Sequence, residues 1–376
     1  MVSKKTYTAP LALAALLLAP AVQAQEQVVR IGVSSPLSGA NAFAGKDNEN
    51  GVRLAVEELN TKKMVIGGKP VRFELRAEDD QGDPKAGVIV AQKFADAGVK
   101  YVLGPYNSGV AIPASRIYND NGIVMSTVGT NPKITQSGYK RVFRIVASDT
   151  QAGAAMADYA GSKIGVKNVG VIDDRTAFGQ GIAMEFVKQA RKNGIKVASH
   201  EFTTDKATDF AAILTSLKAK KVDAIFFGGY APQAAPMARQ MKALGLNAKL
   251  MGGDTLCSPE MAKLGGDAVG ENVLCAQGGA ILDKQATGPA FQARYTQRFK
   301  QKPDVYAPSF YDQTMFIAQA MKAANSIDPA VVSQAMHTQS YRGVVGNYAY
   351  DAAGNMKQSA VTIYTFRNGA PVPVSK

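Results

Sequence analysis

Two short polar turns carry the side chains best suited to hold a ligand. NSG (107–109) and GTNP (129–132) each follow a strand-like segment and precede a helix-like one. Free backbone N–H groups and the positive end of a helix dipole would therefore lie beside Ser108 and Thr130. Two consecutive turns of this kind are expected to converge on one small anion, and a carboxylate suits them. A serine or threonine before a helix is more commonly only a cap, and that alternative stays open.

Prolines predict where the helices after these turns begin. Pro113 fits best in or near a first helical turn, so we expect the first helix to begin just beyond Gly109. In the second turn, Asn131 or Thr130 would cap the helix that Pro132 opens. Exposed backbone amides would then lie beside both hydroxyl groups.

A phenol and a carboxylate follow two later strand-like segments. FFGGYAP (226–232) places Tyr230 after one strand, and LMGGD (250–254) places Asp254 after the next. Asp254 could accept hydrogen bonds from an ammonium group, while Tyr230 offers a hydroxyl group and a ring face for a cation. The alternative for Asp254 is a cap for the helix that SPEM begins. The segment thus indicates a cation seat and leaves a structural role open.

Two phenylalanines stand in glycine-rich segments, Phe43 in SGANAFAG and Phe178 in RTAFGQG. Both segments follow strands and are expected to be loops, where a large apolar side chain is unusual unless it covers something. An anion seat, a cation seat and aromatic walls between them describe a site for a zwitterion with an apolar side chain.

The motifs of several enzyme classes are missing. The sequence contains no GxSxG, HExxH, CxxC or GxxxxGK[ST], and IGVSSPLSG does not satisfy the GxGxxG pattern. Neither histidine, His200 or His337, lies beside a cysteine. We expect both histidines at the surface or with satisfied hydrogen bonds, and we expect no catalytic residue, metal or cofactor.

The cysteines are Cys257 and Cys275, separated by 18 residues. In an oxidising compartment such a pair favours a disulfide. A loop of this size would contribute about 3 kcal/mol by chain-entropy reasoning. Two buried free thiols are the alternative.

Alternating strands and helices must position these residues. Nearly continuous apolar strands in such an alternation predict an α/β fold, with parallel sheets covered by helices on both faces. The alternation pauses at RIVASDTQAG (144–153), which we interpret as a boundary between two lobes. Strands are predicted at 28–33, 71–77, 100–104, 122–127, 169–173 and 224–229, and helices at 48–60, from Pro84 to Gly98, and along the stripe of Ile182, Phe186 and Ala190.

The first 24 residues have the pattern of a secretory signal peptide. Lys4 and Lys5 precede an apolar run at 11–19, and Val22-Gln23-Ala24 provides a small-residue site for cleavage after Ala24. An uncleaved membrane anchor is the alternative, although the run is shorter than the roughly 20 residues that a membrane-spanning helix needs. We therefore expect export to the periplasm.

Size and charge bound the class of the remaining chain. The 352 residues from Gln25 onward exceed what one compact core usually holds, so two domains are expected. The net charge of +13 includes Lys4 and Lys5, which leaves +11. The cations are scattered, and the densest run, at 218–221, closes a helix whose dipole they offset. We expect no nucleic-acid partner.

Together these motifs resemble the leucine/isoleucine/valine-binding proteins of bacterial ABC importers, which are type I periplasmic binding proteins. The resemblance covers essentially the whole chain after residue 24. It implies two lobes joined by three crossovers, at 25–146 with 279–350 and at 147–278 with 351–376. The motifs that carry it are IGVSSPLSGANAFAGKDNENGVRLAVEELN, AEDDQGDPKAGVIVAQKF, VLGPYNSGVAIPAS, VGTNPKIT, FGGYAPQ and MGGD.

The resemblance also implies roles for single residues. Ser108 would bind the ligand carboxylate, Thr130 both ends of the amino acid backbone, and Asp254 the ammonium group. Val128 and Gly129 would act through main-chain atoms. The aromatic residues of the site would be Tyr230, Tyr106, Phe43 and Phe178.

This sequence departs from the family pattern at several positions. Phe43 and Phe178 stand where relatives often carry tyrosine, and Asp254 where leucine-binding members often carry glutamate. The cysteine pair lies in the second lobe, whereas some relatives have theirs in the first. These departures concern the preference for the ligand's side chain more than the amino acid backbone site.

The function that this reading implies is a monomeric clamp for an L-amino acid, most simply leucine, isoleucine or valine. The clamp would deliver its ligand to the membrane permease subunits of an ABC importer. The same fold could instead bind an aromatic carboxylate, an aromatic amino acid, or an amide or urea-like compound. Two further alternatives are an exported enzyme using Asp254 and Tyr230, and a ligand-binding domain that a membrane-bound receptor partner carries.

Overall fold

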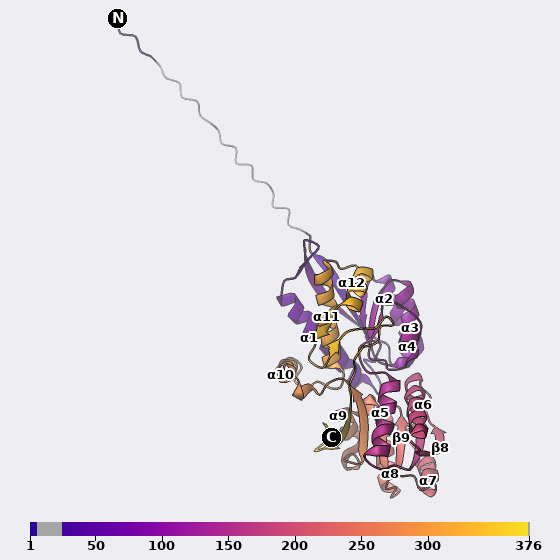
Figure 1. Cartoon of the computed structure of the whole chain (residues 1–376). Coiled ribbons are helices and arrows are strands. Elements are labelled where there is room, and N and C mark those ends of the chain that lie inside the picture. The colour runs from indigo at the N-terminus through magenta and orange to yellow at the C-terminus, as the bar shows by residue number, and fades with distance from the viewer. Residues whose placement is uncertain (6–24, 375–376) are drawn as a thin grey trace.

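Two lobes, each built around a largely parallel sheet, form the computed structural model, which describes residues 1–5 and 25–374 (Figure 1). One lobe lies above the other in Figure 1, with the early strands and α11 in the upper lobe and β8 and β9 in the lower. We call them lobe one and lobe two. Most of the predicted signal peptide, residues 6–24, lies outside the described residues.

The sheet of lobe one has the order β2-β3-β1-β4-β5-β6. All its neighbouring strands are parallel except β2 and β3, which form a hairpin. The central strand β1 is fully buried over its second half, as expected for a strand covered on both faces. The elements are β1 (Gln27–Ser35), α1 (Ala42–Thr61), β2 (Val65–Ile66), β3 (Lys69–Asp79), α2 (Pro84–Asp96), β4 (Tyr101–Leu103), α3 (Ser108–Asp120), β5 (Val124–Thr127), α4 (Lys133–Gln136) and β6 (Val142–Arg144).

The sheet of lobe two has the order β15-β14-β11-β10-β9-β7-β8. Strands β7 to β11 are parallel, and β14 and β15 add an antiparallel edge. The elements are α5 (Asp149–Ser162), β7 (Asn168–Asp173), α6 (Ala177–Lys192), β8 (Lys196–Phe202), α7 (Ala211–Ala219), β9 (Ala224–Gly228), α8 (Ala231–Ala243), β10 (Lys249–Gly252), η1 (Asp254–Leu256), α9 (Pro259–Gly265), η2 (Gly266–Ala268), β11 (Val273–Gly278), β14 (Val361–Arg367) and β15 (Ala370–Pro373).

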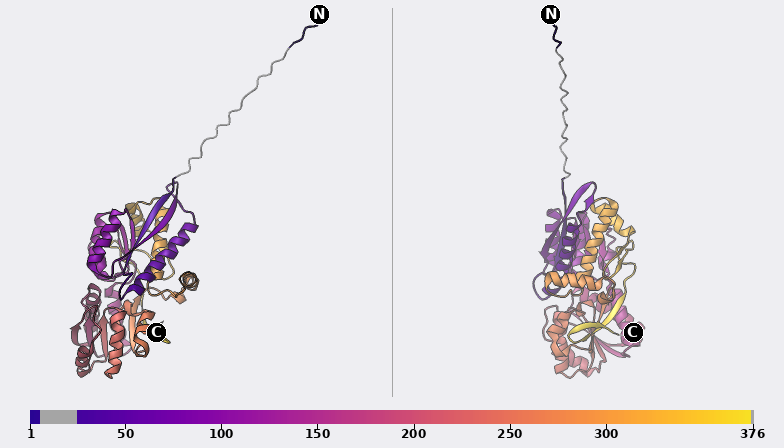
Figure 2. Two further views of the ribbon diagram at one scale, coloured as in Figure 1. Left: turned by 180° about the vertical axis from the view of Figure 1, so that it is seen from behind. Right: turned by 90° about the vertical axis from the view of Figure 1, so that its left-hand side faces the viewer.

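Within the described residues, the chain passes between the lobes after β6, after β11 and before β14 (Figure 2). Between the second and third passages lie η3 (Leu282–Lys284), α10 (Gly288–Phe299), α11 (Ala307–Ala324), α12 (Pro329–Thr338) and the hairpin of β12 (Tyr341–Arg342) and β13 (Asn347–Tyr348). Helices α10 and α11 pack against α1 and so belong to lobe one. The two-lobe α/β fold is confirmed, while the exact lobe limits stay a prediction.

The two glycine-rich segments are not the loops that the sequence suggested. Phe43 lies in the first turn of α1 and Phe178 in the first turn of α6. Their glycines serve close packing, since an added Cβ at Gly45 would lie 1.9 Å from the carbonyl oxygen of Pro36. At Gly179 it would lie 2.5 Å from the carbonyl oxygen of Gly228. At Gly45 and Gly179, glycine is therefore required by neighbouring backbone, whereas Gly39, before α1, is favoured by its positive φ of 75°.

Helix α3 begins earlier than expected. It starts at Ser108, so Pro113 lies inside the helix rather than in its first turn. Proline has no backbone N–H group, so inside a helix it removes one backbone hydrogen bond and is normally destabilising. The start is fixed instead by contacts of Ser108 with the neighbouring turn, described below, so a tertiary interaction overrides the local preference. By contrast, Asp83 caps α2 and Pro84 opens it, as predicted.

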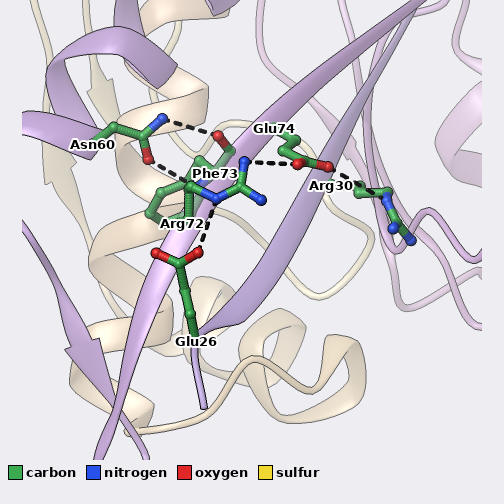
Figure 3. A network of polar contacts seen from close by, with 6 residues as sticks. All are labelled: Glu26, Arg30, Asn60, Arg72, Phe73 and Glu74. Atoms are coloured by element: carbon green, nitrogen blue, oxygen red, sulfur yellow. Dashed lines mark hydrogen bonds and ion pairs between the residues drawn. The ribbon is translucent and has the colours of Figure 1, made fainter. Parts of the chain in front are cut away.

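The outer surface of lobe one carries a network of polar contacts (Figure 3). Arg72 of β3 pairs with Glu26, just before β1, at 2.9 Å and with Glu74 of its own strand at 2.7 Å, while Arg30 of β1 pairs with Glu74 at 3.6 Å. Asn60 of α1 joins both backbone polar groups of Phe73, at 2.8 and 2.9 Å. The charged side chains of the two Arg72 pairs are 37–51% exposed, so water screens each pair and its contribution to stability is small. The network supports the sheet surface.

Candidate ligand-binding site

Ser108 joins the two predicted turns. Its Oγ accepts hydrogen bonds from the backbone N–H groups of Thr130 and Asn131, both at 3.2 Å. The convergence predicted for these turns is therefore present. Because both acceptor positions of a hydroxyl oxygen are occupied, the Ser108 O–H group remains as a donor. A donor fixed in this way at the start of α3 is suited to an anion.

Arg144, which sequence reasoning missed, holds the second turn from behind. Its buried guanidinium donates to the carbonyl oxygens of Thr130 and Asn131, the latter at 2.8 Å. It also donates to Thr135 Oγ1 at 2.6 Å and to Asn355 Oδ1 at 3.0 Å. Burial lowers the Arg144 pKa to about 10, so the group stays charged at neutral pH. An arginine closing the apolar strand VFR was the available signal.

Val128 and Gly129, the two residues before Thr130, were predicted to bind the ligand through main-chain atoms. Val128 is buried, and the Gly129 N–H group already donates to Thr127 Oγ1 at 2.8 Å. An added Cβ at Gly129 would lie 2.7 Å from Ile134 Cδ1, which explains the glycine. The Gly129 amide is therefore engaged within the protein, and the main-chain roles of both residues stay a prediction.

Asp149, the second missed residue, lies beside Thr130. Its backbone N–H group donates to the Thr130 carbonyl oxygen at 2.9 Å, and Ser148 starts α5 with a capping box. Burial raises the pKa of Asp149 to about 8, and the Thr130 hydroxyl and the Arg144 charge only partly offset this. The Thr130 hydroxyl lies near the carboxyl group but forms no hydrogen bond of normal geometry with it.

Unsatisfied polar atoms make this position a candidate binding surface. Thr130 Oγ1 and both carboxyl oxygens of Asp149 are buried without a hydrogen-bond partner in the part of the chain that the structure describes. Buried polar groups are nearly always paired, and exceptions call for an explanation. A polar ligand group would supply the missing partner.

Asp254 opens η1, directly after the end of β10. It is 3% exposed, its Oδ1 accepts from the Thr255 N–H group at 3.0 Å, and its Oδ2 accepts from the hydroxyl group of Tyr306. Burial raises its pKa to about 6. The capping alternative is wrong, because Ser258 caps α9 by accepting from the Glu260 N–H group at 3.1 Å. Tyr306, just before α11, was missed because only the fold brings it to Asp254.

Aromatic rings connect the two lobes at this place. The ring centroid of Tyr106 lies 5.8 Å from that of Tyr306 and 6.0 Å from that of Tyr230. Phe178 lies 5.2 Å from Tyr230, and Phe43 lines a small cavity with Tyr106 and Tyr306. Burial raises the pKa of each of these tyrosines well above its usual value, so their hydroxyl groups stay protonated. The predicted aromatic residues are thus gathered in one cluster.

The lobes touch through polar contacts around this cluster. Besides the Tyr306–Asp254 pair, Asn131 Nδ2 donates to the Ala177 carbonyl oxygen at 2.7 Å. Ser258 Oγ donates to Asp304 Oδ2 at 2.6 Å. These contacts join lobe one to the helix and loop ends of lobe two, so the structure is a closed arrangement of the lobes.

The remaining candidates have structural roles. Cys257 and Cys275 form a disulfide, as expected. His200 Nε2 lies 2.6 Å from Asp173 Oδ2, and the ring nitrogens of His337 each lie 3.0 Å from a carbonyl oxygen, so both rings have polar partners within the protein. Among the described residues, no cluster of His, Cys, Asp and Glu could hold a metal ion, and no helix could cross a membrane.

A larger groove lies elsewhere, in lobe two. It has a volume of about 590 Å³ and is lined by residues that include Asp223 and Lys249. These residues lie at the amino ends of β9 and β10, whereas ligands in open α/β sheets bind at the carboxyl ends of the strands. Ser108, Thr130, Tyr230 and Asp254 all follow carboxyl ends, so we place the candidate site at the aromatic cluster.

Comparison with known proteins agrees with the two-lobe fold. A model of the family described as "Periplasmic binding protein" matches residues 28–371. A Leu/Ile/Val-binding protein homolog of Brucella abortus is 35% identical over 344 residues, 91% of each chain.

Solved structures share the same architecture. A leucine-binding protein from Thermotoga maritima superposes with a TM-score of 0.85 and 26% identity, over 92% of this chain and 98% of that one. A solute-binding protein from Rhodopseudomonas palustris in complex with benzoate has a TM-score of 0.83 and 21% identity, over 93% and 96%. The chain therefore belongs to the periplasmic binding protein family, among relatives named Leu/Ile/Val-binding proteins.

Proposed function

We propose that this protein captures an L-amino acid with an apolar side chain between its lobes and delivers it to the permease of an ABC importer. The observation that carries the proposal is a pair of buried carboxyl groups, Asp149 and Asp254. Both Asp149 oxygens lack a hydrogen-bond partner among the described residues, and the Asp149 pKa is raised first by burial and to a lesser degree by the charge of Asp254. Two such groups repel each other unless a cation lies with them. The ammonium group of an amino acid supplies that cation.

The other end of an amino acid fits the joined turns of lobe one. The Ser108 hydroxyl group is left as a donor and sits at the start of α3, where the helix dipole favours a negative charge. Thr130 Oγ1, still unpartnered, lies between this seat and Asp149. A carboxylate at Ser108 and an ammonium group near Asp149 and Asp254 would satisfy all three positions.

The aromatic cluster supports an apolar ligand side chain. Rings of Tyr106 and Tyr306 from lobe one meet those of Tyr230 and Phe178 from lobe two. An aliphatic side chain buried among them gains about 25 cal/mol for each Å² of apolar surface removed from water. Leucine, isoleucine and valine, which the names of the curated relatives include, are the ligands we place first.

The mechanism needs closure and no covalent step. A ligand that binds the closed arrangement better than the open one shifts the population toward closure. Closure removes water from Asp254 and from the Ser108 seat, so a ligand that leaves either group unpaired is penalised. The permease would then recognise the closed form in the periplasm, after removal of the signal peptide.

A second candidate ligand is an aromatic carboxylate. One observation favours it: Tyr306 already donates to Asp254, whose raised pKa allows it to be protonated, so the carboxyl group does not require a cation. The rings that surround it would then stack on the aromatic ligand. Such a ligand would use the Ser108 seat alone.

A thermal-shift panel tests both candidates. The purified protein, unfolded and refolded to remove carried-over ligand, is heated with each of the twenty L-amino acids and with benzoate, acetamide and urea. A rise of several degrees with a few apolar amino acids supports the proposal, because a ligand of the folded state stabilises it. A rise with benzoate and none with any amino acid would replace the amino acid by an aromatic carboxylate.

A further inference from the structure

The turn that carries Asp254 has little intrinsic rigidity. It follows Gly252 and Gly253, and glycine loses more conformational freedom on folding than any other residue. Gly252 is the last residue of β10, and η1 spans only Asp254–Leu256. Something outside the turn must therefore hold the Asp254 carboxyl group in place.

Both ends of this turn are attached to the same residue, Cys275. Gly252 pairs with Cys275 across β10 and β11, so the start of the turn is attached to Cys275 by the sheet. Cys257, the residue after η1, is bonded to the same Cys275 through sulfur. The segment 253–256 is thus a loop whose two ends both meet Cys275. Its carboxyl group can move only as far as this closed loop allows.

Contacts inside the loop transmit the constraint to Asp254. The Cys257 N–H group donates to the Asp254 carbonyl oxygen at 2.9 Å. Thr255 Oγ1 donates to the Gly229 carbonyl oxygen at 2.7 Å, which links the loop to the residue before Tyr230. The Asp254 side chain itself reaches out of lobe two to the Tyr306 hydroxyl group of lobe one. If the lobes part, that last contact is lost, and the disulfide and the Thr255–Gly229 hydrogen bond remain as constraints on the turn.

We propose that the Cys257–Cys275 disulfide is a positioning element of the ligand site, which fixes the Asp254 carboxyl group for a cationic ligand group. The proposal rests on the function proposed above. It makes ligand affinity dependent on the oxidation state of the protein. Dithiothreitol would donate two electrons and two protons, leaving two thiols and becoming a cyclic disulfide itself. Both cysteines are buried, so substitution is the cleaner way to remove the bond.

A double-mutant cycle tests the proposal. The variants are C257A/C275A, Asp254→Asn and their combination, each titrated with L-leucine by calorimetry. If the disulfide acts through Asp254, removing it weakens L-leucine binding roughly tenfold in the wild type and not further in the Asp254→Asn background, because coupled sites are not additive. Equal losses in both backgrounds would contradict the proposal and leave only a general structural role.

A second ligand separates positioning from unfolding. 4-Methylpentanoate has the carbon skeleton of leucine without the ammonium group, so its weaker binding should be the same with and without the disulfide. An equal loss for both ligands would again contradict the proposal. If C257A/C275A does not fold by circular dichroism, the same comparison is made on wild-type protein before and after reduction by dithiothreitol.

The outcomes also separate this inference from the proposed function. Wild-type protein that binds no amino acid would overturn both. Wild-type protein that binds L-leucine, with C257A/C275A binding it equally well, would overturn the disulfide proposal alone.

Discussion

Asp254 and Asp149 are acidic side chains that the protein buries at a cost, and burial raises the pKa of both. Moving a carboxylate out of water is unfavourable unless it gains partners. Tyr306 and the Thr255 amide provide some for Asp254, while both oxygens of Asp149 lack one among the described residues. Buried carboxyl groups with too few hydrogen-bond partners indicate a ligand that would supply them. The first two predictions concern these groups.

Replacing Asp254 by asparagine should weaken L-leucine binding by about 2–5 kcal/mol, measured by calorimetry, because the ligand ammonium loses a buried ionic partner. Asparagine has nearly the same shape and keeps an oxygen for the Tyr306 hydroxyl group. The matched control is Asp267→Asn, which removes an exposed carboxylate of the same lobe that pairs with Lys242. Wild-type affinity in Asp254→Asn would remove this residue from the site.

The raised pKa values of Asp149 and Asp254 predict opposite pH dependences for stability and for binding. Between an ordinary aspartate value of 3.8 and the folded values of about 8 and about 6, the folded protein binds more protons than the unfolded chain. The free energy of unfolding of the ligand-free protein should therefore fall as the pH rises through this window. Affinity for an amino acid should rise over the same window, because an ammonium group favours the ionised carboxylates.

Calorimetric titrations with L-leucine between pH 5 and pH 8.5, beside thermal melts of the stripped protein, check this pair of slopes. Asp149→Asn should remove the upper part of both slopes. The lower part of the binding slope is assigned to Asp254. The lower part of the stability slope is shared with Asp47, Asp80, Asp174, Asp304 and Asp312, whose pKa values burial raises to about 6 or about 7. Affinity that falls as the pH rises would show that the ligand does not place a cation between these groups.

Helix α6 is the element of lobe two that lies against the GTNP turn. An added Cβ at Gly181 would lie 2.5 Å from Asn131 Nδ2 and 2.6 Å from Asp149 Oδ2. Asn131 Nδ2 also makes the contact with the Ala177 carbonyl oxygen that joins the lobes. Glycine at this position therefore allows the closed arrangement, although alanine would favour the helix itself by about 1 kcal/mol.

Gly181→Ala should weaken ligand binding. The methyl group would displace Asn131 of lobe one and keep the lobes from closing fully, and it would also crowd the Asp149 carboxyl group of its own lobe. Gly161→Ala in α5 is the control, since its nearest neighbour, Ile195 Cδ1, would lie 3.4 Å away. Thermal melts with and without L-leucine compare the two variants. An equal ligand-induced shift in both would refute this role of α6.

At the scale of elements, periodicity was enough to predict the α/β fold, because buried parallel strands need unbroken apolar runs such as AIFFGG and VGVID. It failed where packing decides. Glycine-rich segments predicted loops at Phe43 and Phe178, but both lie in first turns of helices, where Gly45 and Gly179 are required by the close backbone of Pro36 and Gly228. Local signals do not contain such contacts.

The candidate site shows the same division between local and long-range information. Ser108, Thr130, Tyr230 and Asp254 follow strands, and strand ends in a parallel sheet lie at one edge, so the sequence could place them together. Tyr306 reaches Asp254 from 52 residues away along the chain, from a segment that follows no strand of the sheet. Arg144 and Asp149 stand in the segment interpreted only as a lobe boundary. Their roles come from the folded crossover.

For the whole molecule, the crossovers and the site are mechanically linked. Arg144 at the first passage between lobes binds the carbonyl oxygens of the GTNP turn and the side chain of Asn355, near the third passage. A rotation of the lobes about these passages must therefore carry the turn with it. The affinity for a ligand at Thr130 should therefore depend on the angle between the lobes, and ligand binding should in turn shift that angle, as thermodynamic linkage requires.

Small-angle scattering tests this coupling on the intact protein. The closed arrangement holds polar inter-lobe contacts, Tyr306 with Asp254, Asn131 with Ala177 and Ser258 with Asp304, that water satisfies equally well when the lobes part. Their net contribution is small, so the ligand must supply the preference for closure, and shifting a two-state balance from 1:99 to 99:1 takes about 5.5 kcal/mol. We expect the radius of gyration of the stripped protein to fall on addition of L-leucine, and to fall less for Gly181→Ala. If calorimetry shows binding while the radius stays constant, the lobes do not close on the ligand, and the contacts between them belong to a rigid molecule.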